Sequence, residues 1–172
     1  NGGEHCHVPV GELQDYIQDA LDLIEFANGS ATSTWGKVRA EMGHPEPFNL
    51  KFIGIGNEQW GSLYPERLEK FVTAIRAQYP KIKIIGSSGP SADGKEFDYL
   101  WPEMKRLKVD LVDEHYYKDP EWFLNSAKRY DNYDRKGPAV FAGEYACHDH
   151  STGKQNNFYS ALCEAAFMTG LE

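Results

Sequence analysis

Residues Lys51-Phe-Ile-Gly-Ile-Gly-Asn-Glu58 form a short apolar run that is interrupted by glycine and too short for a helix. Such a run predicts a buried strand over residues 51–57, with Glu58 directly after it. Before this run, residues 11–28 carry apolar side chains at spacings of three and four, which predicts an amphipathic helix. The residues between the two, 30–49, are polar, and no helix or strand is assigned to them.

Helices and strands continue to alternate after this first strand. Strands are predicted over residues 82–86, 109–116 and 139–145, and helices over 65–79, 97–107 with an interruption near Pro102, 119–130 with Asp119 as its cap, and 157–169. The strands start near residues 51, 82, 109 and 139, at separations of 31, 27 and 30 residues, close to the ~31 per unit of a (β/α)8 barrel of ~250 residues. The alternation favours an α/β fold with a parallel sheet, either a small open sheet or about half of a TIM barrel.

The composition is that of a soluble globular domain, with 172 residues of which 41% are hydrophobic and 26% are charged. No apolar run approaches the ~18–20 residues that cross a bilayer, so no membrane association is expected. Acidic residues outnumber Lys and Arg by 26 to 18, and the net charge of −8 argues against a nucleic-acid partner. The sequence starts at Asn1 rather than Met, so the localisation stays open, with secretion or the periplasm favoured over the cytoplasm.

Two glutamates end two different predicted strands, Glu58 after the first and Glu144 at the end of the fourth. In parallel α/β folds the reactive groups gather at the carboxyl ends of the strands. A facing pair of carboxylates is what glycosidic cleavage requires, one as proton donor and one as nucleophile or base. His115 and Tyr117 share one face of the third strand and could hold such a carboxylate, and Asn57 could bind a sugar hydroxyl. Taken singly, either glutamate would more often be a solvated loop charge than a catalytic group.

Three of these runs resemble the α-L-arabinofuranosidases of glycoside hydrolase family 51, namely Ile53-Gly-Ile-Gly-Asn-Glu58, Glu114-His-Tyr-Tyr117 and Phe141-Ala-Gly-Glu-Tyr-Ala146. The resemblance extends to residues 31–36, 43–48 and 119–123, and so covers essentially the whole chain. It implies a (β/α)8 TIM barrel of the large clan of retaining glycosidases. The resemblance further implies that residues 1–172 are part of a single catalytic domain and supply barrel strands 4 to 7. Strands 1 to 3, strand 8 and the family's β-sandwich domain are then absent from these residues.

The resemblance also implies a role for each candidate residue. Glu58 matches the general acid/base at the end of strand 4, and Glu144 matches the nucleophile at the end of strand 7. Asn57 matches the residue that contacts the sugar near its 2-hydroxyl, and His115 and Tyr117 match the strand-6 site residues, with Tyr117 as the hydrogen-bond partner of the nucleophile. The implied reaction releases terminal arabinofuranosyl residues from arabinan or arabinoxylan, with retention, through a covalent arabinosyl-enzyme intermediate. No cofactor is implied, and a homo-oligomer is possible.

Several alternatives remain open at this point. A β-xylosidase or an endoglucanase of the same clan would use the same two glutamates, and a non-catalytic, truncated carbohydrate-binding module would use neither. Trp60 follows Glu58 by two residues and is a candidate wall of a sugar subsite, although a core role is the alternative. His5-Cys-His7 and Cys147-His-Asp-His150 contain ligand-type residues, but adjacent ligands chelate one ion poorly, so no metal is expected.

Overall fold

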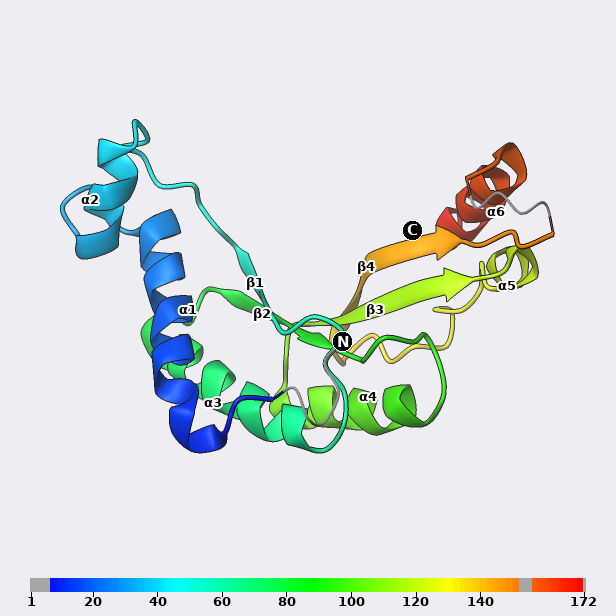
Figure 1. Ribbon diagram of the computed structural model, residues 1–172, viewed down its shortest axis with the longest axis horizontal. Coiled ribbons are helices and arrows are strands. Elements are labelled where there is room, and N and C mark those ends of the chain that lie inside the picture. The colour runs from blue at the N-terminus through cyan, green and yellow to red at the C-terminus, as the bar shows by residue number, and fades with distance from the viewer. Residues whose placement is uncertain (1–6, 152–155, 172) are drawn as a thin grey trace.

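The computed structural model describes residues 7–151 and 156–171. Its elements are, in chain order, η2 (Val10–Glu12), α1 (Leu13–Asn28), α2 (Thr34–Glu41), β1 (Phe52–Ile55), α3 (Leu63–Gln78), β2 (Lys83–Ser87), α4 (Lys95–Leu107), β3 (Leu111–Lys118), α5 (Pro120–Asn125), β4 (Ala139–Cys147) and α6 (Phe158–Met168). The strands pair in parallel in the order β1-β2-β3-β4 (Figure 1). The predicted α/β fold is confirmed, and one curved four-stranded parallel sheet is consistent with part of a barrel.

Helix α2 was not predicted, because it buries Gly36 and the charged Arg39 and no apolar side chain. Ser33 caps the helix by accepting a hydrogen bond from the backbone N–H of Gly36. Arg39 is fully buried and donates to four backbone carbonyls, those of Phe26, Gly29, His44 and Pro45. The guanidinium therefore replaces the apolar stripe by which an amphipathic helix is usually found.

Two predicted helices differ from the structure. The expected interruption of α4 near Pro102 is wrong, since the helix runs through it; Pro102 is exposed, so water can bond the carbonyl that its missing N–H leaves. The helix predicted over residues 119–130 ends at Asn125. Its cap is confirmed, because the Asp119 carboxylate accepts the N–H of Trp122 at 2.8 Å. Beyond Asn125 the chain forms turns that direct Arg129 toward β3.

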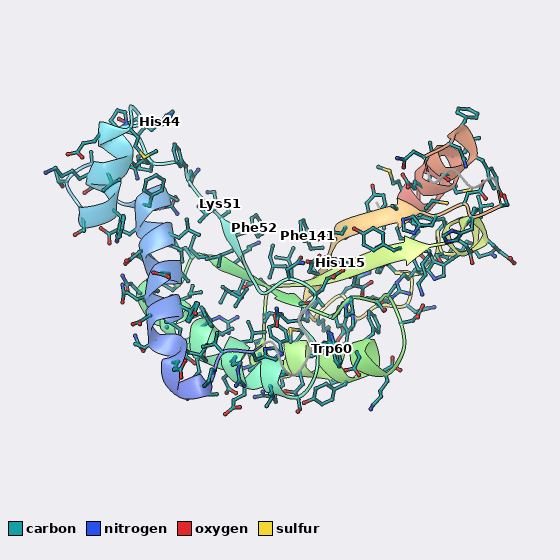
Figure 2. The ribbon with its side chains drawn as sticks, in the orientation of Figure 1. His44, Lys51, Phe52, Trp60, His115 and Phe141 are labelled. Atoms are coloured by element: carbon teal, nitrogen blue, oxygen red, sulfur yellow. The ribbon has the colours of Figure 1, made fainter. Side chains whose placement is uncertain are left out.

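The apolar core lies between the sheet and the helices on its outer side. One cluster joins α1, α3 and α4 to the first three strands, and a second joins α5 and α6 to β3 and β4. The opposite, concave side of the sheet is not covered by a helix in the described residues (Figure 1). Phe52 and Phe141 lie on this side with exposed fractions of 43% and 45% (Figure 2).

Candidate active site

The concave side brings together three residues from separate strands. One ligand-type atom each of Glu58, His115 and Glu144 lies within 4.8 Å of the other two. Glu58 follows β1, whereas His115 lies in β3 and Glu144 in β4. Residues that are 57 and 29 positions apart in the sequence thus form one cluster, because parallel strands end at the same edge of the sheet.

Tyr64 fixes the end of β1 from which Glu58 projects. Its hydroxyl donates to the carbonyl of Ile55 at 2.7 Å and accepts the N–H of Ser87, at the end of β2, at 2.9 Å. Burial raises the pKa of the Tyr64 hydroxyl, so it stays a neutral donor and acceptor. Glu58 itself has a left-handed backbone with φ of 51°, a conformation that costs a residue other than glycine about 1–3 kcal/mol and is concentrated at functional sites.

A β-bulge turns Glu144 toward the concave side. Glu114 of β3 is opposite Ala142, but the next residue, His115, is opposite Glu144, so Gly143 is an extra residue in β4. In a regular strand, residues three apart face opposite sides. The bulge restores the concave-side direction after Phe141 and places Glu144 beside His115.

His115 lies between three carboxylates. Its ring is 1% exposed. Nδ1 is 3.0 Å from Glu58 Oε1 and 3.6 Å from Glu144 Oε2, and Nε2 is 2.9 Å from Asp113 Oδ2. Burial alone would lower the pKa of His115, but the hydrogen bond to Glu58 and the charge of Asp113 outweigh it, and the pKa is raised.

Tyr117 contacts the other glutamate. Its hydroxyl donates to Glu144 Oε2 at 2.9 Å, which is the contact that the resemblance implies. That hydrogen bond raises the pKa of Tyr117, so the phenol stays protonated as a donor. The catalytic roles of the two residues stay predictions.

Asn57 and Trp60 lie near the end of β1 in different surroundings. Asn57 is exposed directly before Glu58, where a sugar could reach it. Trp60 is partly buried and packs against the core cluster of α1, α3 and α4 (Figure 2), and its backbone carbonyl lies 3.3 Å from His7 Nε2. This packing favours the core alternative for Trp60, and its place in a sugar subsite stays a prediction.

Two acidic residues of β3 were not singled out from the sequence. Asp113 contacts both His115 and, through Oδ1, the N–H of Gly143 at 3.1 Å. Glu114 points to the opposite side and is fully buried. Its carboxylate accepts hydrogen bonds from five side chains, Trp101, Tyr116, Arg129, Tyr130 and Tyr133. The alternation along the strand was the available signal, since it places Glu114 on the helix side, where a charge needs donors.

The cluster of Glu58, His115 and Glu144 has the spacing of a metal site, but its chemistry fits a proton better. Both ring nitrogens of His115 face carboxylates at hydrogen-bond distance. A metal on Nδ1 would need that lone pair free and would have to displace the contact to Glu58.

The ligand-type residues after β4 have other partners. Among residues 7–151 and 156–171, the ligand atoms of Cys147-His-Asp-His150 are not part of a group of three within reach of one ion. Asp149 accepts hydrogen bonds from Ser151 and Asn157, and the His148 ring lies 5.5 Å from that of Tyr117. His5 and Cys6 lie outside the described residues.

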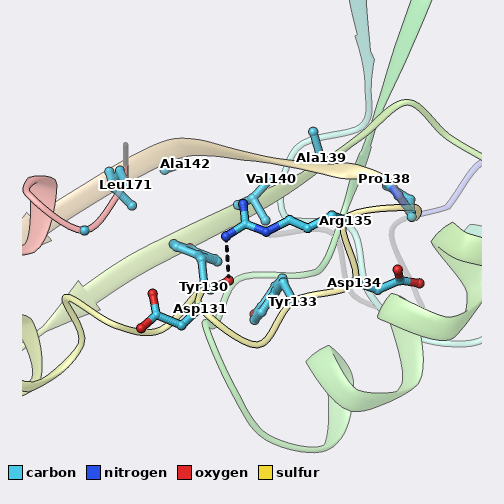
Figure 3. A pocket seen from close by; sticks show the side chains of 12 residues that line it. Tyr130, Asp131, Tyr133, Asp134, Arg135, Pro138, Ala139, Val140, Ala142 and Leu171 are labelled. Carbon is cyan, nitrogen blue, oxygen red and sulfur yellow. Dashed lines mark hydrogen bonds between the residues drawn. The ribbon is translucent and has the colours of Figure 1, made fainter.

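A cavity of about 580 Å³ lies along the helix-facing side of β4 (Figure 3). It is lined by Val140 and Ala142 of the strand and by the segment that contains Tyr130 and Arg135. Arg135 donates to the carbonyl of Tyr130 at 3.4 Å. None of the predicted site residues lines this cavity, so the acidic cluster and the cavity are separate features.

The sequence of this chain is similar to those of known proteins. The family model described as the alpha-L-arabinofuranosidase 1 domain matches residues 1–135. An extracellular exo-alpha-L-arabinofuranosidase of Streptomyces chartreusis is 52% identical over 161 residues, which are 93% of this chain and 19% of that protein. Alpha-L-arabinofuranosidase 2 of Arabidopsis thaliana is 40% identical over 174 residues, 100% of this chain and 24% of that protein. The chain thus spans about a fifth to a quarter of these relatives.

The chain is also similar to solved structures of α-L-arabinofuranosidases. The arabinose-bound MgGH51 α-L-arabinofuranosidase is similar over 95% of this chain and 27% of its own, with a TM-score of 0.78 and 34% identity. The α-L-arabinofuranosidase of Thermotoga maritima in complex with arabinose has a TM-score of 0.64 at 20% identity, over 90% of this chain and 37% of its own. The second likeness shows a shared fold.

Proposed function

This chain belongs to the α-L-arabinofuranosidases of glycoside hydrolase family 51, and from that premise we propose that it is the segment of a (β/α)8 catalytic domain that carries both catalytic glutamates. In this proposal β1 to β4 are barrel strands 4 to 7, and residues 1–172 are part of one domain. The match to the family model and the curved four-stranded parallel sheet support it. The remaining strands of the barrel then belong to residues outside this sequence.

The proposed reaction is a double displacement with retention. Glu144 attacks the anomeric carbon while Glu58 gives a proton to the leaving oxygen, and Glu58 then takes a proton from the water that releases the sugar. The observation that carries this proposal is the spacing of the two glutamates. One oxygen of Glu58 and one oxygen of Glu144 lie within 4.8 Å of each other, so the two groups are as close as a retaining pair, whose carboxyl groups are ~5–5.5 Å apart, rather than spread over the ~6.5–9.5 Å of an inverting pair.

His115 separates the roles of the two glutamates. With Nε2–H donating to Asp113, Nδ1 and Glu58 Oε1 share one proton across their 3.0 Å contact. The raised pKa of His115 keeps a proton on or beside its ring, next to the carboxylate that is proposed to act as acid and base. Glu144 accepts from Tyr117 and lies 3.6 Å from the His115 ring, and these two contacts orient the carboxylate that is proposed to act as nucleophile.

The proposed substrate is a terminal α-L-arabinofuranosyl residue of arabinan or arabinoxylan. The printed names of the relatives support it, since one is an exo-acting α-L-arabinofuranosidase and two solved structures hold arabinose. The Streptomyces relative is named extracellular, which supports secretion of the present protein. No helix in residues 7–151 and 156–171 is long and apolar enough to cross a bilayer.

The test uses a graft in which these 172 residues replace the matching segment of the Streptomyces chartreusis relative. Glu144→Ala should abolish turnover of an aryl arabinofuranoside, and a rate near that of the parent graft would reject the assignment. Glu58→Ala should spare substrates with good leaving groups more than natural ones, with rescue by azide. Hydrolysis of an aryl xyloside or a glucan in preference to the arabinofuranoside would favour another activity of the clan. Binding of oligosaccharide without any cleavage would favour the non-catalytic module.

A further inference from the structure

We propose that Asp113 is a positioning residue that aligns the two glutamates, by holding the bulge that aims Glu144 and by orienting the ring of His115 toward Glu58. The roles of the glutamates rest on the function proposed above. The alignment itself rests on contacts among five described residues, which can be measured without catalysis.

Asp113 contacts the backbone of the β-bulge in β4. Gly143 is the extra residue of β4, and the N–H of a bulged residue lacks its regular ladder partner. Asp113 Oδ1 accepts this N–H at 3.1 Å. A Cβ atom on residue 143 would lie 2.2 Å from the same oxygen, so the contact needs glycine. Asp113 therefore stabilises the backbone irregularity that turns the following residue, Glu144, into the site.

Asp113 also contacts the imidazole of His115. Asp113 Oδ2 is 2.9 Å from His115 Nε2. A carboxylate at this place fixes the proton on Nε2 and leaves Nδ1 to share a proton with Glu58. Because the ring is buried, it has no bulk water to compensate for a lost partner. One carboxylate thus acts on both glutamates, on Glu144 through the backbone and on Glu58 through the ring.

The surroundings make both contacts depend on the charge of Asp113. Burial raises the pKa of Asp113, the His115 charge and hydrogen bonds lower it, and the nearby Glu144 raises it, with a net increase. Among the described residues, the charged groups that contact His115 are Glu58 after β1, Asp113 on β3 and Glu144 on β4, and Tyr117 donates to Glu144. Removal of the Asp113 charge should therefore make protonation of His115 harder.

The first test is an NMR titration of His115 in the 172-residue chain, with the ring signals assigned by comparison with His115→Gln. Asp113→Asn has one oxygen where the carboxylate has two, so it cannot accept from both Gly143 and His115. The midpoint of the His115 titration is expected to move to lower pH. The matched control is Asp110→Asn, directly before β3, where a carboxylate oxygen accepts the N–H of Ile84 at 2.9 Å. That variant should leave the titration of His115 where it is.

The second test measures catalysis in the graft. Asp113→Asn is expected to lower kcat about tenfold to hundredfold with little change in KM, because misplaced reacting groups slow the chemical step more than binding. Gly143→Ala should lower kcat in the same way, because its methyl group displaces the Asp113 carboxylate. Asp110→Asn should keep the kcat of the parent graft.

The outcomes separate this inference from the proposed function. If Asp113→Asn shifts neither the His115 midpoint nor kcat relative to Asp110→Asn, Asp113 is an ordinary strand residue and the inference is wrong. A free-imidazole titration of His115 in the unsubstituted chain would also overturn it, even if the variants do not fold. If the parent graft is inactive but the His115 midpoint moves in Asp113→Asn, the proposed function fails and the alignment by Asp113 stands.

Discussion

Replacement of Glu114 by alanine removes the carboxylate that joins β3, an inner strand, to side chains on the helix side of the sheet. Oε1 accepts from Trp101 at 2.9 Å and from Tyr133 at 3.0 Å. Oε2 accepts from the hydroxyls of Tyr116 and Tyr130 at 2.7 and 2.9 Å. Alanine leaves these donors without their acceptor in a site that water does not reach.

The charge makes the loss larger. Arg129 Nε lies 3.3 Å from Glu114 Oε2, and its side chain is only 16% exposed. Removal of one partner of a buried ion pair costs about 3–5 kcal/mol, since the other charge stays buried without its ion-pair partner. We therefore expect Glu114→Ala to lower the free energy of unfolding by about 3–5 kcal/mol. That is a large share of the ~5–15 kcal/mol of a typical domain.

Glutamine at the same position provides the graded comparison. Its carbonyl oxygen can still accept on one side, and tyrosine hydroxyls can turn to accept from its amide. The expected loss for Glu114→Gln is about 1–3 kcal/mol. The assay is urea unfolding followed by far-UV circular dichroism, with equal m-values required before midpoints are compared. Glu41→Ala is the control, because Glu41 pairs with Lys37 on the exposed surface at 3.8 Å, a contact worth about 0–1 kcal/mol. A Glu114→Ala variant no less stable than this control would refute the reasoning.

Three further expectations concern the other contacts of the site. Because the pKa of His115 is raised in the folded state, its contribution to stability is fully present below the unfolded pKa of about 6.5 and is lost as pH rises through the higher folded pKa. The gap between the urea midpoints of the parent and His115→Gln should therefore shrink with rising pH, and a gap that widens would contradict the direction of this pKa shift. Tyr64→Phe leaves the Ile55 carbonyl and the Ser87 N–H without their shared partner, and should cost about 1–3 kcal/mol in the same urea assay; no loss would mean that the hydroxyl does not tie β1 to β2. Tyr117→Phe removes the donor to Glu144 from an exposed position, so the graft should lose kcat at an unchanged urea midpoint, whereas full activity would exclude a role for that hydrogen bond.

The alternation of elements could be predicted from the sequence because short runs with apolar residues alternate with stretches of helical periodicity. Helix α2 lacks the apolar pattern on which such a prediction depends. Its buried residue, Arg39, is satisfied by carbonyls that come from residues 26 to 45, and no local pattern reveals such partners. At Pro102 the sequence predicted an interruption that the helix does not have, since an exposed proline can be accommodated inside a helix.

The candidate site was predictable from the residues toward the carboxyl ends of the strands, but the contacts of Asp113 were not. Glu58 and Glu144 attract attention because polar residues at these ends commonly do chemistry. Asp113 contacts His115 in the same cluster, but its proposed role depends on the extra residue at Gly143. A bulge shifts the register of two strands that are distant in sequence, so it becomes visible only once the pairing is known.

The measurement that tests the central claim most directly is the site of covalent labelling by a 2-fluoro arabinofuranosyl substrate with a good leaving group. The fluorine destabilises the positive charge of both transition states, and the good leaving group keeps the first step fast enough for the intermediate to accumulate. Peptide mapping of the labelled graft by mass spectrometry should find one added sugar on Glu144. A label on Glu58, or a product of inverted anomeric configuration with no label, would contradict the assignment of Glu144 as nucleophile.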